Sequence, residues 1–279
     1  MLRSAAFLGC GCMACAPRHA TAFAALSAPP PADAARWDVP RDAAADGKFA
    51  EGMAFGMRDY EAAVRLRKAA LFRRLFAGLR PGSTVVELGL GAFPNAPFYR
   101  AAPAGLDIVG VDPNDRMEPF ARRVARDNGL LASSPPGAGV QLGATPPSTP
   151  PPCHALRVVH GVGEALPLAD RTADAVVCTL TLCSVLDPAR TLAEVRRVLR
   201  PGGKLLFHEH VLSETDGALA EAQERLTPAQ VKRADGCHLN RRTLRDIEAA
   251  GFKGGVEAEY YELKDFLYLN PTVSGIATA

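Results

Sequence analysis

The chain lacks a strong charge of either sign, and it lacks any apolar run long enough to cross a membrane. Its 279 residues include 32 Lys and Arg against 30 Asp and Glu, a formal charge of +2. Nucleic-acid binding needs a basic face that neutralises phosphates, and this balance indicates none. The longest apolar stretch, residues 5–16, is shorter than the roughly 20 residues that span a bilayer. We therefore expect no nucleic-acid partner and no transmembrane segment.

Cysteine is scarce, and its spacing indicates neither a metal site nor a disulfide framework. Three of the seven cysteines lie within the first 16 residues, where small apolar residues prevail. The other four are Cys153, Cys178, Cys183 and Cys237. They show no metal-ligand spacing and no disulfide density, which is typical of proteins in a reducing compartment. No bound metal is therefore expected.

The N-terminal region has no acidic residue before Asp33 and is rich in Ala, Ser and Pro. The apolar stretch 5–16 follows Arg3 and leads to Ala20-Thr21-Ala22, which has the form of a signal cleavage site before Phe23. This junction resembles those of proteins imported into plastids that are bounded by extra membranes; a mitochondrial presequence and a secretory signal are the alternatives. We expect residues 1–47 to be targeting presequence and linker, and residues 48–279 to form one domain.

Helical and strand-like patterns alternate through that domain. Apolar residues recur at helical spacing over 60–79, and further helices are expected over 115–128 and 188–199. Short buried strands are expected at 84–88, 106–111, 157–160, 175–179 and 204–208, with a final antiparallel strand pair within 252–279. Residues 131–153 are too rich in Pro for a helix or central strand and are read as a flexible insertion. The alternation predicts a doubly wound α/β fold.

The strongest local motif is Glu87-Leu88-Gly89-Leu90-Gly91, directly after the first expected strand. Glycines at this point allow a tight turn and a close approach of backbone N–H groups to a ligand. Asp112 ends the second expected strand, where a carboxylate can accept hydrogen bonds from both hydroxyls of a ribose. Together these residues indicate an adenosine-containing ligand, which both a methyltransferase and a nicotinamide-dependent reductase would bind.

Motifs further along the chain distinguish these two possibilities. They are Gly161-Val162-Gly163-Glu164-Ala165-Leu166-Pro167-Leu168, Asp174-Ala175-Val176-Val177-Cys178, and the helix pattern from residue 193 that runs into Arg200-Pro201-Gly202-Gly203. This order resembles the class I S-adenosylmethionine-dependent methyltransferases. The segments 178–185, 209–211 and 235–237 resemble the methyltransferase-like 7 group, whose animal members methylate alkyl thiols, and its plant and algal relatives.

The resemblance implies a Rossmann-like, seven-stranded, mostly parallel sheet of order 3-2-1-4-5-7-6 with helices on both faces. It also implies S-adenosylmethionine as methyl donor and a small-molecule nucleophile, such as a thiol, as acceptor. The residues that it assigns to the donor are Glu87, Gly89 and Gly91 at the methionine end, Asp112 and Pro113 at the ribose, Glu164 and Ala165 at the adenine, and Thr179 and Leu180 beneath the sulfonium.

The glycine loop departs from the family at Phe93, where a small residue is usual. Phenylalanine adopts positive φ only at a cost and fills space that glycine leaves empty. A protein that binds S-adenosylmethionine without catalysis is therefore one alternative. An NAD(P)-dependent Rossmann reductase is another, although the chain has no evident Tyr-x-x-x-Lys pair.

Catalytic residues are harder to assign than binding residues. The candidates for a base or pocket residue are His210, Tyr60 and His238. On a strand, His208 and His210 point to one side and Glu209 to the other, so only the two histidines could share a metal, and no third ligand is close in sequence. Cys178 and Cys183 are read as small buried residues rather than nucleophiles.

Overall fold

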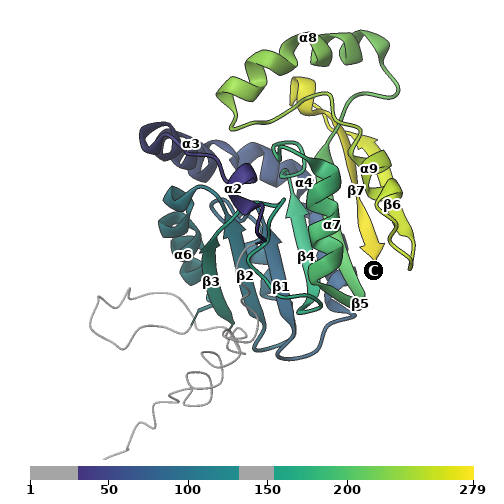
Figure 1. Ribbon diagram of the computed structural model, residues 1–279. Helices are drawn as coiled ribbons and strands as arrows, with labels where there is room; N and C mark the ends of the chain where they lie inside the picture. The colour runs from purple at the N-terminus through teal and green to yellow at the C-terminus, as the bar shows by residue number, and fades with distance from the viewer. Residues whose placement is uncertain (1–30, 132–153) are drawn as a thin grey trace, which may run out of the picture.

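The computed structural model describes residues 31–131 and 154–279, which form a seven-stranded sheet with helices on both faces (Figure 1). The strand order is β3-β2-β1-β4-β5-β7-β6, as the resemblance implied. The first five strands are parallel, and β7 runs antiparallel to both β5 and β6. The strands are β1 (Thr84–Leu88), β2 (Asp107–Asp112), β3 (Ala155–His160), β4 (Ala173–Thr179), β5 (Leu199–His210), β6 (Val256–Glu262) and β7 (Pro271–Thr278).

Two hydrophobic cores lie on opposite faces of the sheet. One packs α7 and α9 against it, and the other packs α4, α5 and α6. In Figure 1, α7 lies in front of the sheet and α4 behind it, while α8 extends beyond the strands. The helices are α2 (Ala34–Trp37), α3 (Ala43–Gly56), α4 (Arg58–Phe76), α5 (Ala96–Tyr99), α6 (Glu118–Asp127), α7 (Pro188–Val198), α8 (Gly217–Arg233) and α9 (Thr243–Ala249), with 3-10 turns η1 (Asp115–Met117) and η2 (Leu267–Leu269).

The central strands form where the sequence predicted them because they are buried on both faces. Every residue of β1 and β2 is buried, as expected for strands in the middle of a parallel sheet. Gly110 in β2 allows the side chain of Leu90 to approach the strand closely, because an added Cβ would collide with it. The glycine loop after β1 is thereby packed directly onto β2.

Regular structure begins before residue 48, within the segment 1–47 that was expected to be presequence and linker. Helix α2 and the first residues of α3 lie there. Asp42 caps α3, its carboxylate accepting hydrogen bonds from the N–H groups of Ala44 (2.8 Å) and Ala45 (3.0 Å). Ala50 is the one buried residue of α3, so the helix has no buried apolar stripe of the kind that packs a helix onto a core. Residues 1–30 of the expected presequence and residues 132–153 of the expected insertion lie outside the described residues.

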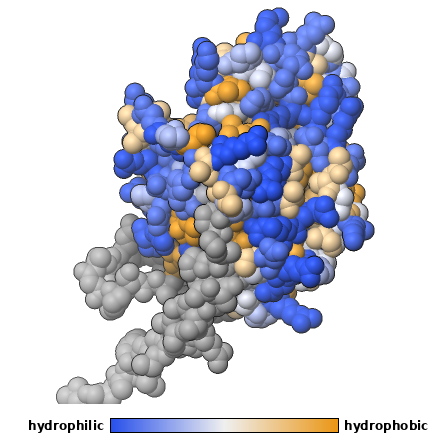
Figure 2. Space-filling model, viewed as in Figure 1, coloured by the Kyte–Doolittle hydropathy of each residue, from blue (hydrophilic) through white to orange (hydrophobic). Residues whose placement is uncertain are grey.

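Hydrophilic residues dominate the face shown in Figure 2, and hydrophobic residues occur there in small groups. Among the described residues, no helix combines the length and apolar character needed to cross a membrane.

Candidate active site

A cavity of about 340 Å³ opens at the carboxyl ends of β1, β2 and β4. Ligands of doubly wound folds bind at this edge, and the volume lies within the usual range of small-molecule sites. The wall is formed by residues from seven parts of the chain, which lie within 37–41, 49–61, 88–94, 111–117, 161–164, 179–186 and 235–236; not every residue of these ranges faces the cavity.

The glycine loop and Asp112 form the part of the wall that the sequence predicted. Gly89 and Gly91 have φ of 68° and 54°, and a Cβ on Gly89 would collide with Thr181. Asp112 accepts hydrogen bonds from the N–H groups of Gly91 (2.8 Å) and Asn114 (2.9 Å). Burial raises the pKa of Asp112, although these hydrogen bonds act in the opposite direction. Pro113 also lines the cavity.

Glu87, by contrast, lies beneath the loop and does not line the cavity. Tyr99 donates a hydrogen bond to its Oε1 (2.6 Å), and the side-chain amide of Asn95 donates one to Oε2 (2.9 Å). Burial raises the pKa of Glu87 to about 7, against the effect of these hydrogen bonds. Both carboxylate oxygens are therefore engaged within the protein, so Glu87 supports the loop from below.

Phe93 has the positive φ that the sequence made costly, 63°, and its side chain is fully buried. The ring packs against Tyr99 with centroids 5.5 Å apart. Left-handed backbone at such a residue costs about 1–3 kcal/mol, and burying a phenylalanine gains about 1.5–3 kcal/mol. Burial of the ring therefore offsets the strain, and the loop still turns as a glycine loop does.

The other assigned residues divide into two groups. Glu164, Thr179 and Leu180 line the cavity, whereas Ala165 is buried behind its wall. The Glu164 carboxylate accepts a hydrogen bond from the N–H of Asp187 (3.0 Å). Leu180 has φ of 53°, which turns the chain directly after β4.

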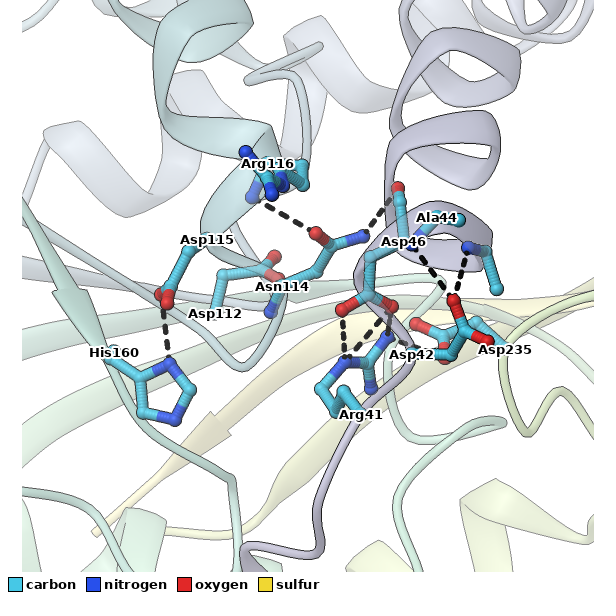
Figure 3. Close-up of polar contacts among 11 residues, drawn as sticks. Arg41, Asp42, Ala44, Asp46, Asp112, Asn114, Asp115, Arg116, His160 and Asp235 are labelled. Atoms are coloured by element: carbon cyan, nitrogen blue, oxygen red, sulfur yellow. Dashed lines mark hydrogen bonds and ion pairs between the residues drawn. The ribbon is translucent and has the colours of Figure 1, made fainter.

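The N-terminal segment completes the wall, an arrangement that was not predicted from the sequence. Arg41 forms ion pairs with Asp46 and with Asp235, both at 2.7 Å, and thereby joins two distant parts of the chain (Figure 3). The side-chain amide of Asn114 donates a hydrogen bond to the Asp46 carbonyl (3.1 Å). His160 lies between Asp115 (2.8 Å) and Asp38 (3.1 Å). The one local signal was Asp42 before an Ala-rich run, which is typical of a helix start.

None of the three catalytic candidates lines the cavity. Tyr60 packs edge-on against His208 and Phe266, with ring centroids 6.3 and 5.4 Å away. Nε2 of His210 lies 3.1 Å from Sγ of Cys237, and Nδ1 of His238 lies 2.7 Å from the carbonyl oxygen of Gly236. The acidic residues of the wall are Asp38, Glu61, Asp112, Glu164 and Asp235. Glu61 is held by Lys68 in an ion pair of 2.8 Å.

Known proteins are similar to this chain in sequence and in fold. Residues 86–207 match the family described as methyltransferase domain. The chain is 38% identical to the thiol S-methyltransferase TMT1B of Rattus norvegicus over 190 residues, 67% of each protein. It is 34% identical to TMT1A of Homo sapiens over 196 residues, 69% of this chain and 70% of that one.

Solved structures with the same fold are more distant in sequence. The complex of a Haloferax volcanii Trm112 methyltransferase activator with a putative methyltransferase gives a TM-score of 0.57 at 18% identity, covering 86% of this chain and 99% of that one. The [4+2]-cyclase SpnF gives 0.53 at 18% identity, covering 76% and 79%. These two show the fold alone. The identity with the rat and human enzymes places the chain in a family: it belongs to the S-adenosylmethionine-dependent methyltransferases, in the group that includes the thiol S-methyltransferases.

Proposed function

We propose that this protein transfers the methyl group of S-adenosylmethionine to the sulfur of a small apolar thiol. The observation that carries the proposal is the apolar side of the cavity. Phe49 and Met53, four residues apart, line it from one face of α3, and Met57, the residue that follows this helix, extends the same apolar side. Val39 and Leu186 line it too and are 50% and 58% exposed. The relatives named thiol S-methyltransferases support the same acceptor class.

The lining residues suit the donor that the family implies. S-adenosylmethionine supplies an electrophilic methyl group on a positively charged sulfur. We assign the Asp112 carboxylate to the ribose hydroxyls and the backbone of Gly89 and Gly91 to the methionine portion. Glu164 belongs to the adenine side, and Thr179 and Leu180 to the reacting centre. The protein's work at this centre is to align donor and acceptor and to exclude water.

The acceptor must lose a proton, because a thiolate attacks far better than a thiol and a free thiol has a pKa near ~8.5. Among the described residues, the cavity wall includes no His, Cys, Lys or Tyr. We therefore propose that the acceptor enters as a thiolate. In the reaction a carbon–sulfur bond to the acceptor forms as the bond from the methyl group to the sulfonium breaks, with its electron pair remaining on the donor sulfur.

The acceptor class can be tested with a matched pair, a thiophenol and the corresponding phenol, and labelled methyl donor. We expect label on the thiophenol only, at a rate that rises with pH through the pKa of the acceptor. Methylation of the phenol at a similar rate would contradict the thiol assignment. Calorimetry with S-adenosylmethionine, its demethylated product and NADH tests the site separately: we expect the first two to bind. Binding without turnover of any acceptor would favour a non-catalytic protein.

We also propose that the N-terminal region directs the protein to a plastid. The basis is the apolar stretch after Arg3, the absence of acidic residues before Asp33, and the Ala20-Thr21-Ala22 junction. A fluorescent protein fused after residue 30 should reach the plastid, and replacing Phe23 should misdirect it. Fluorescence in mitochondria or in the endomembrane system would support the alternative signals instead.

A further inference from the structure

Three potential metal ligands that are far apart in the sequence meet beside the cavity. Sγ of Cys183, a ring nitrogen of His210 and Sγ of Cys237 all lie within 4.8 Å of one another. They come from the loop after β4, the end of β5 and the loop after α8. All three side chains are buried, with exposures of 2%, 2% and 8%.

We propose that Cys183, His210 and Cys237 bind a zinc ion, which fixes together the two loops that form one wall of the cavity. The donor set favours zinc because thiolate and imidazole are its preferred ligands. Zn–S bonds of about 2.3 Å and Zn–N bonds of about 2.0–2.1 Å place tetrahedral ligand atoms roughly 3.5–3.8 Å apart. In the structure His210 Nε2 and Cys237 Sγ are 3.1 Å apart, and all the ligand atoms lie within 4.8 Å of one another. Changes of about an ångström or less in these distances would give the tetrahedral spacing.

The backbone already holds the two cysteine loops together. The N–H of His238 donates a hydrogen bond to the carbonyl of Cys183 (2.8 Å). Gly236 has φ of 80°, and an added Cβ would lie 2.8 Å from the carbonyl oxygen of Ser184. Only glycine allows this approach. The cysteine ligands are thus positioned by contacts that need no metal to form, which lowers the ordering cost of binding.

The position of the cluster indicates what the ion does. Ser184 and Gly236, the neighbours of the two cysteines, line the cavity, whereas the cysteines themselves do not. A nucleophilic role for Cys237 needs access to the cavity, which its burial denies. Zinc binding displaces the protons of both thiols and joins the loops through two metal–sulfur bonds. Three protein ligands leave the fourth coordination position to water or another small ligand.

The experiment measures metal in the full-length protein, purified without chelator. We expect about one zinc per chain, falling at least about tenfold in Cys183→Ser and in Cys237→Ser. Cys178→Ser is the matched control, because Cys178 is equally buried and lies outside the cluster. Joint replacement of Cys10, Cys12 and Cys15 by Ser is the second control. Both controls should keep their zinc.

A second measurement does not depend on the variants folding. Replacing zinc by Co²⁺ in the unaltered protein should give the intense near-ultraviolet absorption of cobalt–thiolate bonds, with the visible bands of tetrahedral cobalt. A protein without metal and without this absorption would overturn the proposal. So would zinc retained in both Cys183→Ser and Cys237→Ser, a Cys183–Cys237 disulfide in protein kept under reducing conditions, or copper in place of zinc.

Discussion

The two sides of the cavity are built in different ways. On the side of β1 and β2, Asp112 is buried and accepts hydrogen bonds from the backbone N–H groups of Gly91 and Asn114. In the N-terminal part of the wall, residues 33–46 are held by ion pairs of partly exposed side chains, Arg41 with Asp235 and His160 with Asp38. Buried, hydrogen-bonded groups are costly to disturb, whereas exposed ion pairs contribute little. We therefore expect Asp112 and the glycine loop to contribute most of the affinity for S-adenosylmethionine, and residues 33–46 to contribute a smaller part.

The largest effect should come from Asp112→Ala. Removing two charge-assisted hydrogen bonds to ribose, each worth roughly 1.5–3 kcal/mol, should weaken S-adenosylmethionine binding by about a hundredfold or more. Calorimetry measures the affinity, and Asp115→Ala is the control, because that exposed carboxylate contacts His160 instead. Equal affinities in both variants would remove the ribose assignment.

Phe93→Gly should lower stability by roughly 2–3 kcal/mol. The substitution relieves the positive φ but removes a fully buried ring, and truncating a core phenylalanine costs more than the strain returns. Denaturant unfolding measures the change. Increased stability would mean that backbone strain, rather than the packing on Tyr99, dominates at this position.

A variant that begins at Lys48 should fold but bind S-adenosylmethionine about tenfold more weakly, a loss of ~1.4 kcal/mol. It lacks Trp37, Val39 and Arg41, which line the cavity. A variant that begins at Pro31 is the control and should bind as the full chain does. Unchanged affinity in the shorter variant would show that the N-terminal segment adds nothing to binding.

Arg41→Ala should have a smaller effect, a loss of about threefold in affinity, since an ion pair of this kind is worth at most about 1 kcal/mol. The loss should shrink as salt concentration rises. Arg67→Ala provides the comparison, because its ion pair with Glu259 is exposed and neither residue lines the cavity. A loss equal to that of Asp112→Ala would contradict the division between the two sides.

The smallest effect concerns pH. Burial lowers the pKa of His160, but its contacts with Asp115 and Asp38 outweigh this and raise it. Because the pKa of His160 is higher in the folded state, its ion pairs stabilise the fold fully at pH values below the pKa of the unfolded chain, near ~6.5. This stabilisation is lost as the pH rises through the pKa of the folded state. After correction for intrinsic exchange rates, hydrogen exchange at residues 34–40 should be less protected at pH 8 than at pH 6. His160→Gln should remove the difference, and a difference that persists would implicate another group.

Much of the fold followed from local patterns. Helix 60–79 was predicted and lies at Arg58–Phe76, and the expected C-terminal strand pair is β6 and β7. The strand order itself came from family resemblance. Gly89, Gly91 and Asp112, which line the cavity, could be singled out because they are close to strand ends, which periodicity locates. Glu87 shows what the motif alone could not predict. The hydrogen bonds from Tyr99 and Asn95 to its carboxylate, which are known only from the structure, indicate that it supports the loop from below.

By itself, the sequence determined the alternation of strands and helices and the glycine loop with its acidic partner, because these depend on contacts within one or two elements. Tertiary structure alone decided that Arg41 meets Asp235, 194 residues away, and that Cys183, His210 and Cys237 form one cluster. The apolar residues of a buried helix or strand recur at a regular spacing, so they can be recognised in the sequence. A single ion pair or a metal-ligand set has no such repeat, and it exists only once folding brings distant side chains within a few ångströms.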